Sequence, residues 1–152
     1  MMSESSGSKF TFSDTFVKIW FDSSVKKHQF PEERSGGYGF VVVEGGTVID
    51  EQADNLGQGK PVTNHRCQYD ALISALKYCK NKYPNASIEL FGRQGNYIEQ
   101  IEGRIDTNDE ELRWRRDEAR ELLDELEIEI QTFSDSEHAE KANRIAGEAA
   151  EM

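Results

Sequence analysis

The stretch TNHRCQYDALISALKYCK, residues 63–80, is where strand patterns in the sequence give way to a helical one. Apolar side chains recur here three or four positions apart, which is the spacing of one face of an α-helix. They are Tyr69, Leu72, Ile73, Leu76 and Cys79. Pro84 cannot continue the hydrogen-bond ladder of a helix, so the pattern predicts a helix over residues 64–82.

Three runs before this helix predict strands because they are rich in β-branched and aromatic residues. They are FVKIWF (16–21), YGFVVV (38–43) and TVIDEQ (47–52). Only the three residues EGG separate the last two runs, which predicts a tight turn and an antiparallel hairpin. The first part of the chain is therefore expected to form an antiparallel meander.

Strand and helix patterns alternate in the second half of the chain. They predict strands at 87–91 and 128–133, a short helix at 96–103 and a longer helix at 109–127. A last helix follows, and Ser134 and Glu137 could form a capping box at its start. The order β-β-β-α-β-α-α-β-α predicts an α/β fold. We expect a five-stranded mixed sheet, an antiparallel meander followed by parallel strands, with helices on both faces.

Composition limits the domain count and the function classes. Residues 1–10 are Ser-rich and polar and predict a disordered tail, which leaves one domain over residues 11–152. The net charge of -11 argues against strong non-specific binding to nucleic acid or an anionic membrane, although a local basic patch stays possible. Halophilic adaptation is an alternative explanation of the acidity. Neither a membrane span nor a signal peptide is expected.

The two cysteines predict a reducing environment. Cys67 and Cys79 lie twelve residues apart on the predicted helix, which separates them by roughly 18 Å. This distance rules out a disulfide and argues against a shared metal ion. We expect both to be small core residues of a cytoplasmic protein.

Five motifs, each on the expected element and in the expected order, carry a family resemblance. They are FDSS (21–24), GGYGFVV (36–42), TNHRCQYDAL (63–72), FGRQGNYIEQIEG (91–103) and KANRIAGEA (141–149). Together they resemble the type 1 ribonuclease H family in its compact form without a basic handle, over residues 16–150. The resemblance implies a ribonuclease H-like fold. It also implies hydrolysis of the RNA strand of an RNA–DNA hybrid by two Mg²⁺ ions that four carboxylates hold.

The family's four carboxylate positions fall on Asp22, Gln68, Arg93 and Asn143, so the resemblance implies that only Asp22 retains an acid. Amide oxygens are weaker ligands for Mg²⁺ than carboxylates, and a cation repels the ion directly. No metal or other cofactor is therefore expected, and Asp22 is the one candidate ligand if Mg²⁺ binds. The alternative is structural: Asp22 pairs with Arg93 in a former metal cavity. Gln68 and Asn143 then satisfy each other, complete the hydrogen bonds of that pair, or bind a backbone or base.

Nucleic-acid contacts have a few weak candidates. The resemblance places Asn64 where the family touches the minor groove, although a helix N-cap or turn residue is an equal alternative. Lys26, Lys27 and His28 form a small basic patch beside the Asp22 position. Loops often carry such charge without a function.

The segment RWRR, residues 113–116, interleaves Trp114 with three arginines. Arg113, Arg115 and Arg116 are candidates for base stacking or phosphate contacts. The alternative is an exposed helix face with pairs four residues apart, such as Glu111 with Arg115.

Three functional hypotheses remain. The first is a catalytically inactive ribonuclease H-like module that binds RNA–DNA hybrid, structured RNA or a protein partner. The second is a divergent, Mg²⁺-dependent ribonuclease H that cleaves RNA in hybrids through Asp22. The third is a protein-interaction scaffold, in line with the acidic charge. Mg²⁺-dependent cleavage, salt-sensitive affinity or an exposed apolar patch would distinguish the three.

Overall fold

A computed structural model of the protein describes residues 15–27, 29–133 and 136–152. Within these residues five strands form one sheet. The strands are β1 (Phe16–Lys26), β2 (Ser35–Glu44), β3 (Thr47–Gln58), β4 (Ser87–Gly92) and β5 (Ile130–Thr132). The helices are α1 (Asn64–Lys82), α2 (Asn96–Ile101), α3 (Glu110–Leu126) and α4 (Glu137–Ala150), with a 3-10 turn, η1, at Pro31–Glu33. The tail predicted at 1–10 lies outside the described residues.

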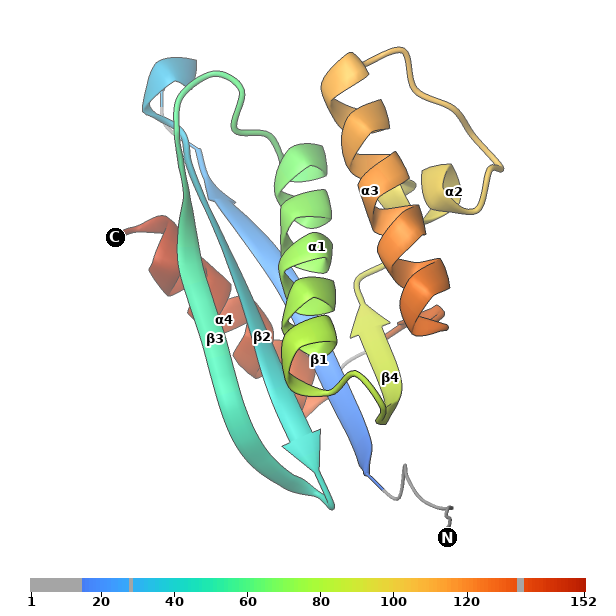
Figure 1. The fold of residues 1–152 in the computed structure, drawn as a ribbon. Helices are drawn as coiled ribbons and strands as arrows, with labels where there is room; N and C mark the ends of the chain where they lie inside the picture. The colour runs from blue at the N-terminus through green and yellow to red at the C-terminus, as the bar shows by residue number, and fades with distance from the viewer. Residues whose placement is uncertain (1–14, 28, 134–135) are drawn as a thin grey trace, which may run out of the picture.

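The sheet has the predicted mixed topology. Its strand order is β3-β2-β1-β4-β5. Strand β2 is antiparallel to both β3 and β1, whereas β1, β4 and β5 are parallel to one another. Figure 1 shows α1 and α3 in front of the sheet, α4 behind it and α2 beside α3. The prediction of an α/β sheet with helices on both faces is confirmed, and no described helix is long and apolar enough to cross a bilayer.

Strands β1 and β3 extend furthest beyond their predicted ends. The first was expected to stop at residue 21, but β1 continues to Lys26 because its polar second half pairs along the first half of β2. The third was expected over 47–52, but β3 reaches Gln58. Because β3 is an edge strand with mostly exposed side chains, its last residues carry no apolar alternation that would have revealed it.

Helix α1 has the predicted bounds, but its cap differs. The Thr63 side chain accepts a hydrogen bond from the Arg66 backbone N–H at 3.2 Å, so Thr63 is the N-cap. Asn64, considered as a cap, is the first helical residue. At α4 the Ser136 side chain caps Ala139 N–H at 3.0 Å, whereas the predicted capping residue Ser134 lies outside the described residues.

The main core lies between the sheet and helices α1 and α3. Its largest fully buried side chains include Phe21, Phe40, Tyr69, Leu72, Leu76 and Leu90. Cys67 and Cys79 are both free and buried, as predicted. Burial raises the pKa of the Cys67 thiol to about 11 and that of Cys79 to about 12. Both are therefore core residues and poor nucleophiles.

Helix α4 packs unusually close to the other face of the sheet. Its buried side consists of alanines, and β2 meets it with Gly37 and Gly39. A Cβ atom at Gly37 would lie 2.5 Å from the Ala146 carbonyl oxygen, so a larger residue would push the helix away. This close contact brings the middle of α4 within reach of the side chains of β1.

Candidate functional site

Asp22 lies on the central strand β1, at a point where three elements meet. The parallel register pairs Trp20 with Phe91, so Asp22 lies beside Arg93, the first residue after β4. Helix α4 brings Asn143 to the same place from the other side of β1. The Asp22 side chain is only 3% exposed, whereas that of Arg93 is 51% exposed.

Four hydrogen-bond donors surround the Asp22 carboxylate. Arg93 Nη2 donates to Oδ2 at 2.8 Å and Arg93 Nε to Oδ1 at 3.4 Å. Asn143 Nδ2 donates to Oδ2 at 3.1 Å, and the Ser23 backbone N–H donates to Oδ1 at 2.8 Å. The arginine therefore grips the buried carboxylate with two groups, the geometry that makes such pairs strong. The predicted Asp22–Arg93 pair is present.

Gln68 does not pair with Asn143 as expected. Asn143 donates to Asp22, and the Gln68 side-chain oxygen instead lies against Gly95, where an added Cβ would come within 3.0 Å of it. Gln68 is on α1, in front of the sheet, whereas Asn143 is on α4, behind it (Figure 1). The two amides therefore belong to helices on opposite faces of the sheet, and the expectation that they satisfy each other was wrong. The expectation that an amide completes the hydrogen bonds of the Asp22–Arg93 pair is confirmed for Asn143.

The loop after β4 holds Arg93 in place. The Tyr97 hydroxyl donates to the Arg93 carbonyl oxygen at 2.7 Å, and the Arg93 guanidinium lies 5.5 Å from the centre of the Phe133 ring. Burial, together with the nearby Asp22 charge, raises the pKa of Tyr97. Tyr97 is therefore a neutral donor that fixes the backbone of the arginine it supports.

The residues at this site do not fit a two-metal Mg²⁺ centre. Mg²⁺ needs several anionic oxygens. Here one carboxylate faces a guanidinium and an amide NH₂ group, both of which are donors. Among the described residues, no group of three or more His, Cys, Asp or Glu side chains is arranged to hold a metal ion. The chemistry that this arrangement supports directly is ion pairing.

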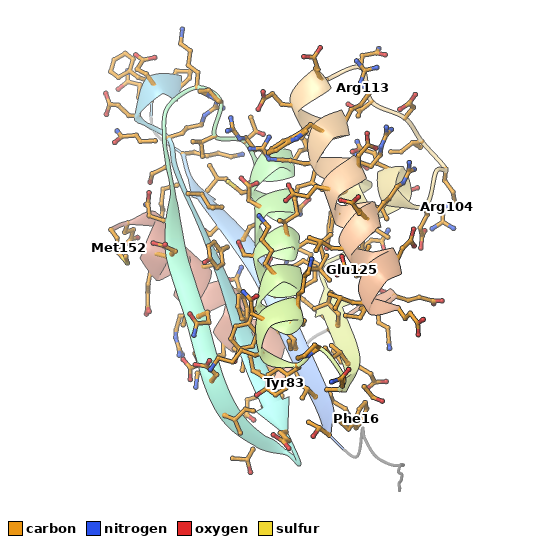
Figure 2. All side chains as sticks on the ribbon, in the orientation of Figure 1. Phe16, Tyr83, Arg104, Arg113, Glu125 and Met152 are labelled. Carbon is orange, nitrogen blue, oxygen red and sulfur yellow. The ribbon has the colours of Figure 1, made fainter. Side chains whose placement is uncertain are left out.

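Some of the predicted nucleic-acid contacts are exposed. Asn64 is exposed at the start of α1, Lys27 follows β1, and Arg113 is exposed in the first turn of α3, where Figure 2 labels it. Lys26 is paired with Glu151 at 2.7 Å. His28 lies outside the described residues.

Arg115 and Arg116 do not belong to an open basic face. The Arg115 side chain is 6% exposed, and its Nε donates to Asp70 on α1 at 2.8 Å. The predicted contact with Glu111 exists at 3.1 Å, but Arg115 is buried between α1 and α3 rather than exposed. Arg116 binds Asp106 at 3.0 Å. Arg115 is therefore not on the surface where phosphates could bind, and the Arg116 guanidinium is already paired with an acid.

Sequence reasoning missed a basic group around the start of α1. Lys60 and His65 are exposed, and Arg66 is partly exposed, 4.0 Å from Glu111 of α3. The signal was present in GKPVTNHR, residues 59–66, which contains three basic or titratable side chains and no acid. These residues flank Asn64 at the positive end of the α1 dipole.

The sequence of this chain is similar to that of a curated protein. No protein-family model matches the chain. Ribonuclease HI from Halobacterium salinarum is 34% identical over 134 residues, which are 88% of this chain. The chain spans 63% of the length of that curated relative.

Solved structures of ribonucleases H have the same fold as this chain. The crystal structure of RNase H1 from the halophilic archaeon Halobacterium salinarum NRC-1 has a TM-score of 0.74 and 32% identity, covering 90% of this chain and 98% of that one. The N-terminal RNase H domain of a Mycobacterium tuberculosis protein, at 22% identity and a TM-score of 0.71, covers 91% of this chain and 95% of its own and shares the fold. The chain belongs to the type 1 ribonuclease H family.

Proposed function

We propose that the protein binds RNA–DNA hybrids and does not cleave them through a two-metal centre. The observation that carries this proposal is the contact of the buried Asp22 carboxylate with Arg93 and Asn143. A metal ion at Asp22 would have to displace a guanidinium that forms two hydrogen bonds, and the described residues offer no group of three or more His, Cys, Asp or Glu side chains to hold it. Fold and family support hybrid binding, because the solved structure of LC11-RNase H1, with the same fold at 18% identity, is in complex with RNA/DNA hybrid.

The distribution of charge supports binding at the end of the molecule where α1 begins. Lys60, His65 and Arg66 lie close to Asn64 along the chain there, and the N-termini of α1 and α3 lie side by side (Figure 1), with Arg66 4.0 Å from Glu111. Backbone N–H groups at a helix N-terminus and nearby cations both attract phosphate. The patch is small in a chain of net charge -11, so we expect modest and strongly salt-dependent affinity.

Binding is tested by fluorescence anisotropy with a labelled RNA–DNA hybrid in EDTA, over a series of salt concentrations. A DNA duplex of the same sequence serves as the comparison ligand. Arg66→Gln should weaken hybrid binding and lower the salt dependence by about one phosphate contact. The matched control is Arg144→Gln on the outer side of α4, which removes the same charge elsewhere and should leave the affinity unchanged. Equal effects of the two variants would contradict the proposed surface.

A second candidate function is Mg²⁺-dependent cleavage of the RNA strand. The relative at 34% identity is named Ribonuclease HI, and this similarity favours an active enzyme. The purified protein should be incubated with the labelled hybrid in Mg²⁺ or Mn²⁺. We expect no cleavage above the buffer blank. Cleavage that Asp22→Asn abolishes would establish the enzyme, whereas cleavage that persists in this variant would identify a contaminating nuclease.

A further inference from the structure

A groove lies between α2, the C-terminal end of α3 and the start of strand β5. It has a volume of about 380 Å³, within the range of roughly 300–1,000 Å³ typical of ligand pockets. Its floor is aliphatic and consists of Ile98, Ile101, Leu123, Ile128 and Ile130. Its rim is acidic and consists of Glu102, Asp124 and Glu129. An apolar floor with an acidic rim fits an occupant that carries both an apolar group and positive charge.

The groove borders an open edge of the sheet. Strand β5 is last in the order β3-β2-β1-β4-β5 and pairs only with β4 among the described strands. It is three residues long, and Gln131 and Thr132 are exposed. An open edge presents backbone N–H and C=O groups that an extended segment can pair with, as in β-strand addition. The Ile130 side chain lies in the groove, so such a segment would run beside the apolar floor.

Negative charge is concentrated around this groove. Residues 121–129, at the end of α3 and just after it, contain five Asp and Glu and no Lys or Arg. Glu102 pairs with Arg104, whereas neither Asp124 nor Glu129 forms a salt bridge within the described residues. The last turn of α3 contains no basic residue, so its carboxylates add to the negative end of the helix dipole. A cation bound here would relieve this repulsion.

We propose that the groove and the β5 edge bind an extended, cationic segment of a partner protein. One aliphatic side chain of the segment fills the groove over Ile101 and Leu123. Lys or Arg residues two positions away on the same face of the segment reach Asp124 and Glu129, because side chains alternate along a strand. Charge excludes nucleic acid from this surface. A second copy is disfavoured because an interface between identical acidic patches would bring like charges together.

The groove is separate from the proposed hybrid site. Arg113 marks the start of α3 and Glu125 its end, and Figure 2 shows them at opposite ends of the helix. The groove lies at the Glu125 end of α3, whereas the basic residues near Asn64 lie at its Arg113 end. Binding at one site therefore does not block the other, and failure of either proposal leaves the other standing.

The test uses a labelled peptide of about ten residues with one central Ile, Lys at the second positions on either side and Ser elsewhere. Anisotropy should report binding that rising salt weakens. The double variant Asp124→Asn/Glu129→Gln should bind about tenfold more weakly, since two partly exposed ion pairs are lost. The matched control Glu32→Gln/Glu44→Gln removes two exposed acids elsewhere and should retain the affinity within about twofold. A peptide with Ser in place of Ile should also bind about tenfold more weakly.

Three results would overturn the proposal. Equal losses in the two double variants would mean that the peptide follows overall charge. Peptide-induced changes in amide NMR shifts that leave residues 129–132 unaffected would mean that the β5 edge is not involved. A dimer in sedimentation that Asp124→Asn/Glu129→Gln disrupts would assign the groove to a second copy of the chain.

Discussion

The protein contains two Asp–Arg pairs with the same N–O distance and opposite burial. In the pair after β4, Asp22 is 3% exposed and Arg93 is 51% exposed, at 2.8 Å. In the pair between α1 and α3, Arg115 is 6% exposed and Asp70 is 24% exposed, also at 2.8 Å. The first pair buries its anion and keeps its cation at the surface, and the second does the reverse.

The difference shows which member of each pair the fold depends on. A buried charge loses its hydration and must keep its partner, whereas an exposed partner can return to water. Arg115 is fixed inside the helical layer, where it joins α3 to α1 and contributes nothing at the surface. Arg93 covers a buried carboxylate while facing solvent. The fold therefore requires some positive or donor group over Asp22, and Arg93 provides it.

The largest effect is expected from restoring the family's acids in the triple variant Gln68→Glu/Arg93→Asp/Asn143→Asp. It removes the cation over Asp22 and adds carboxylates around it, so the metal-free fold should lose about 4 kcal/mol or more. Urea unfolding in EDTA measures this loss, and Mg²⁺ should recover part of it because only the folded state gathers the acids. A variant as stable in EDTA as the parent would show that these positions do not share one site. Arg93→Asn alone is the control that removes the cation without adding acids.

The next effect separates the two members of the first pair. Arg93→Gln leaves the buried Asp22 charge without a cation and should reduce the free energy of unfolding by about 2–3 kcal/mol. Asp22→Ala removes more hydrogen bonds but frees only an exposed guanidinium, so it should cost less, about 1 kcal/mol. Denaturant titration of both variants at neutral pH gives the comparison. A larger loss for Asp22→Ala would contradict the importance of burial.

The second pair should show the reverse order. Asp70→Asn keeps an acceptor but removes the charge, which leaves the buried Arg115 guanidinium with the largely exposed Glu111 as its ion-pair partner within the described residues, and it should cost about 1–2 kcal/mol. Arg115→Met should cost less, because Asp70 can hydrate and Met fills the space between the helices. Asp106→Asn removes the exposed partner of Arg116 and should change stability by less than about 0.5 kcal/mol. If Arg115→Met is the most damaging of the three, packing rather than charge dominates at this position.

These two pairs also show how far the sequence predicts the molecule. The Asp22–Arg93 pair was predictable because both residues lie in motifs with a known place on neighbouring strands. The burial of Arg115 was not recognised, since RWRR looks like a charged surface. A signal existed: Arg115 is three residues after Leu112 and four before Ala119, which puts it on the inner stripe of α3. Its partner Asp70 depends on how α1 and α3 pack together, which no local pattern contains.

The bounds of helices and strands also divide into those that a local pattern predicts and those that depend on pairing or packing. Helix α1 has the predicted bounds because an apolar stripe and Pro84 define it. The polar ends of β1 and β3 are strands only through pairing with β2. The positions of Gln68 and Asn143 could not be derived either. Whether two amides meet depends on which face of the sheet each helix covers.

The smallest effect at the Asp22 site concerns Asn143, the neutral partner of Asp22. Asn143→Ser keeps a similar helix propensity but is too short to reach the Oδ2 atom that Asn143 binds at 3.1 Å, so it should cost about 0.5–1 kcal/mol. The effect should grow in the Arg93→Gln background, because Asn143 is then one of few donors left to a buried charge. A double-mutant cycle in urea should therefore give a coupling of about 0.5 kcal/mol or more. Additive losses would mean that Arg93 and Asn143 stabilise Asp22 independently, and that the buried carboxylate does not set the energetics of the site.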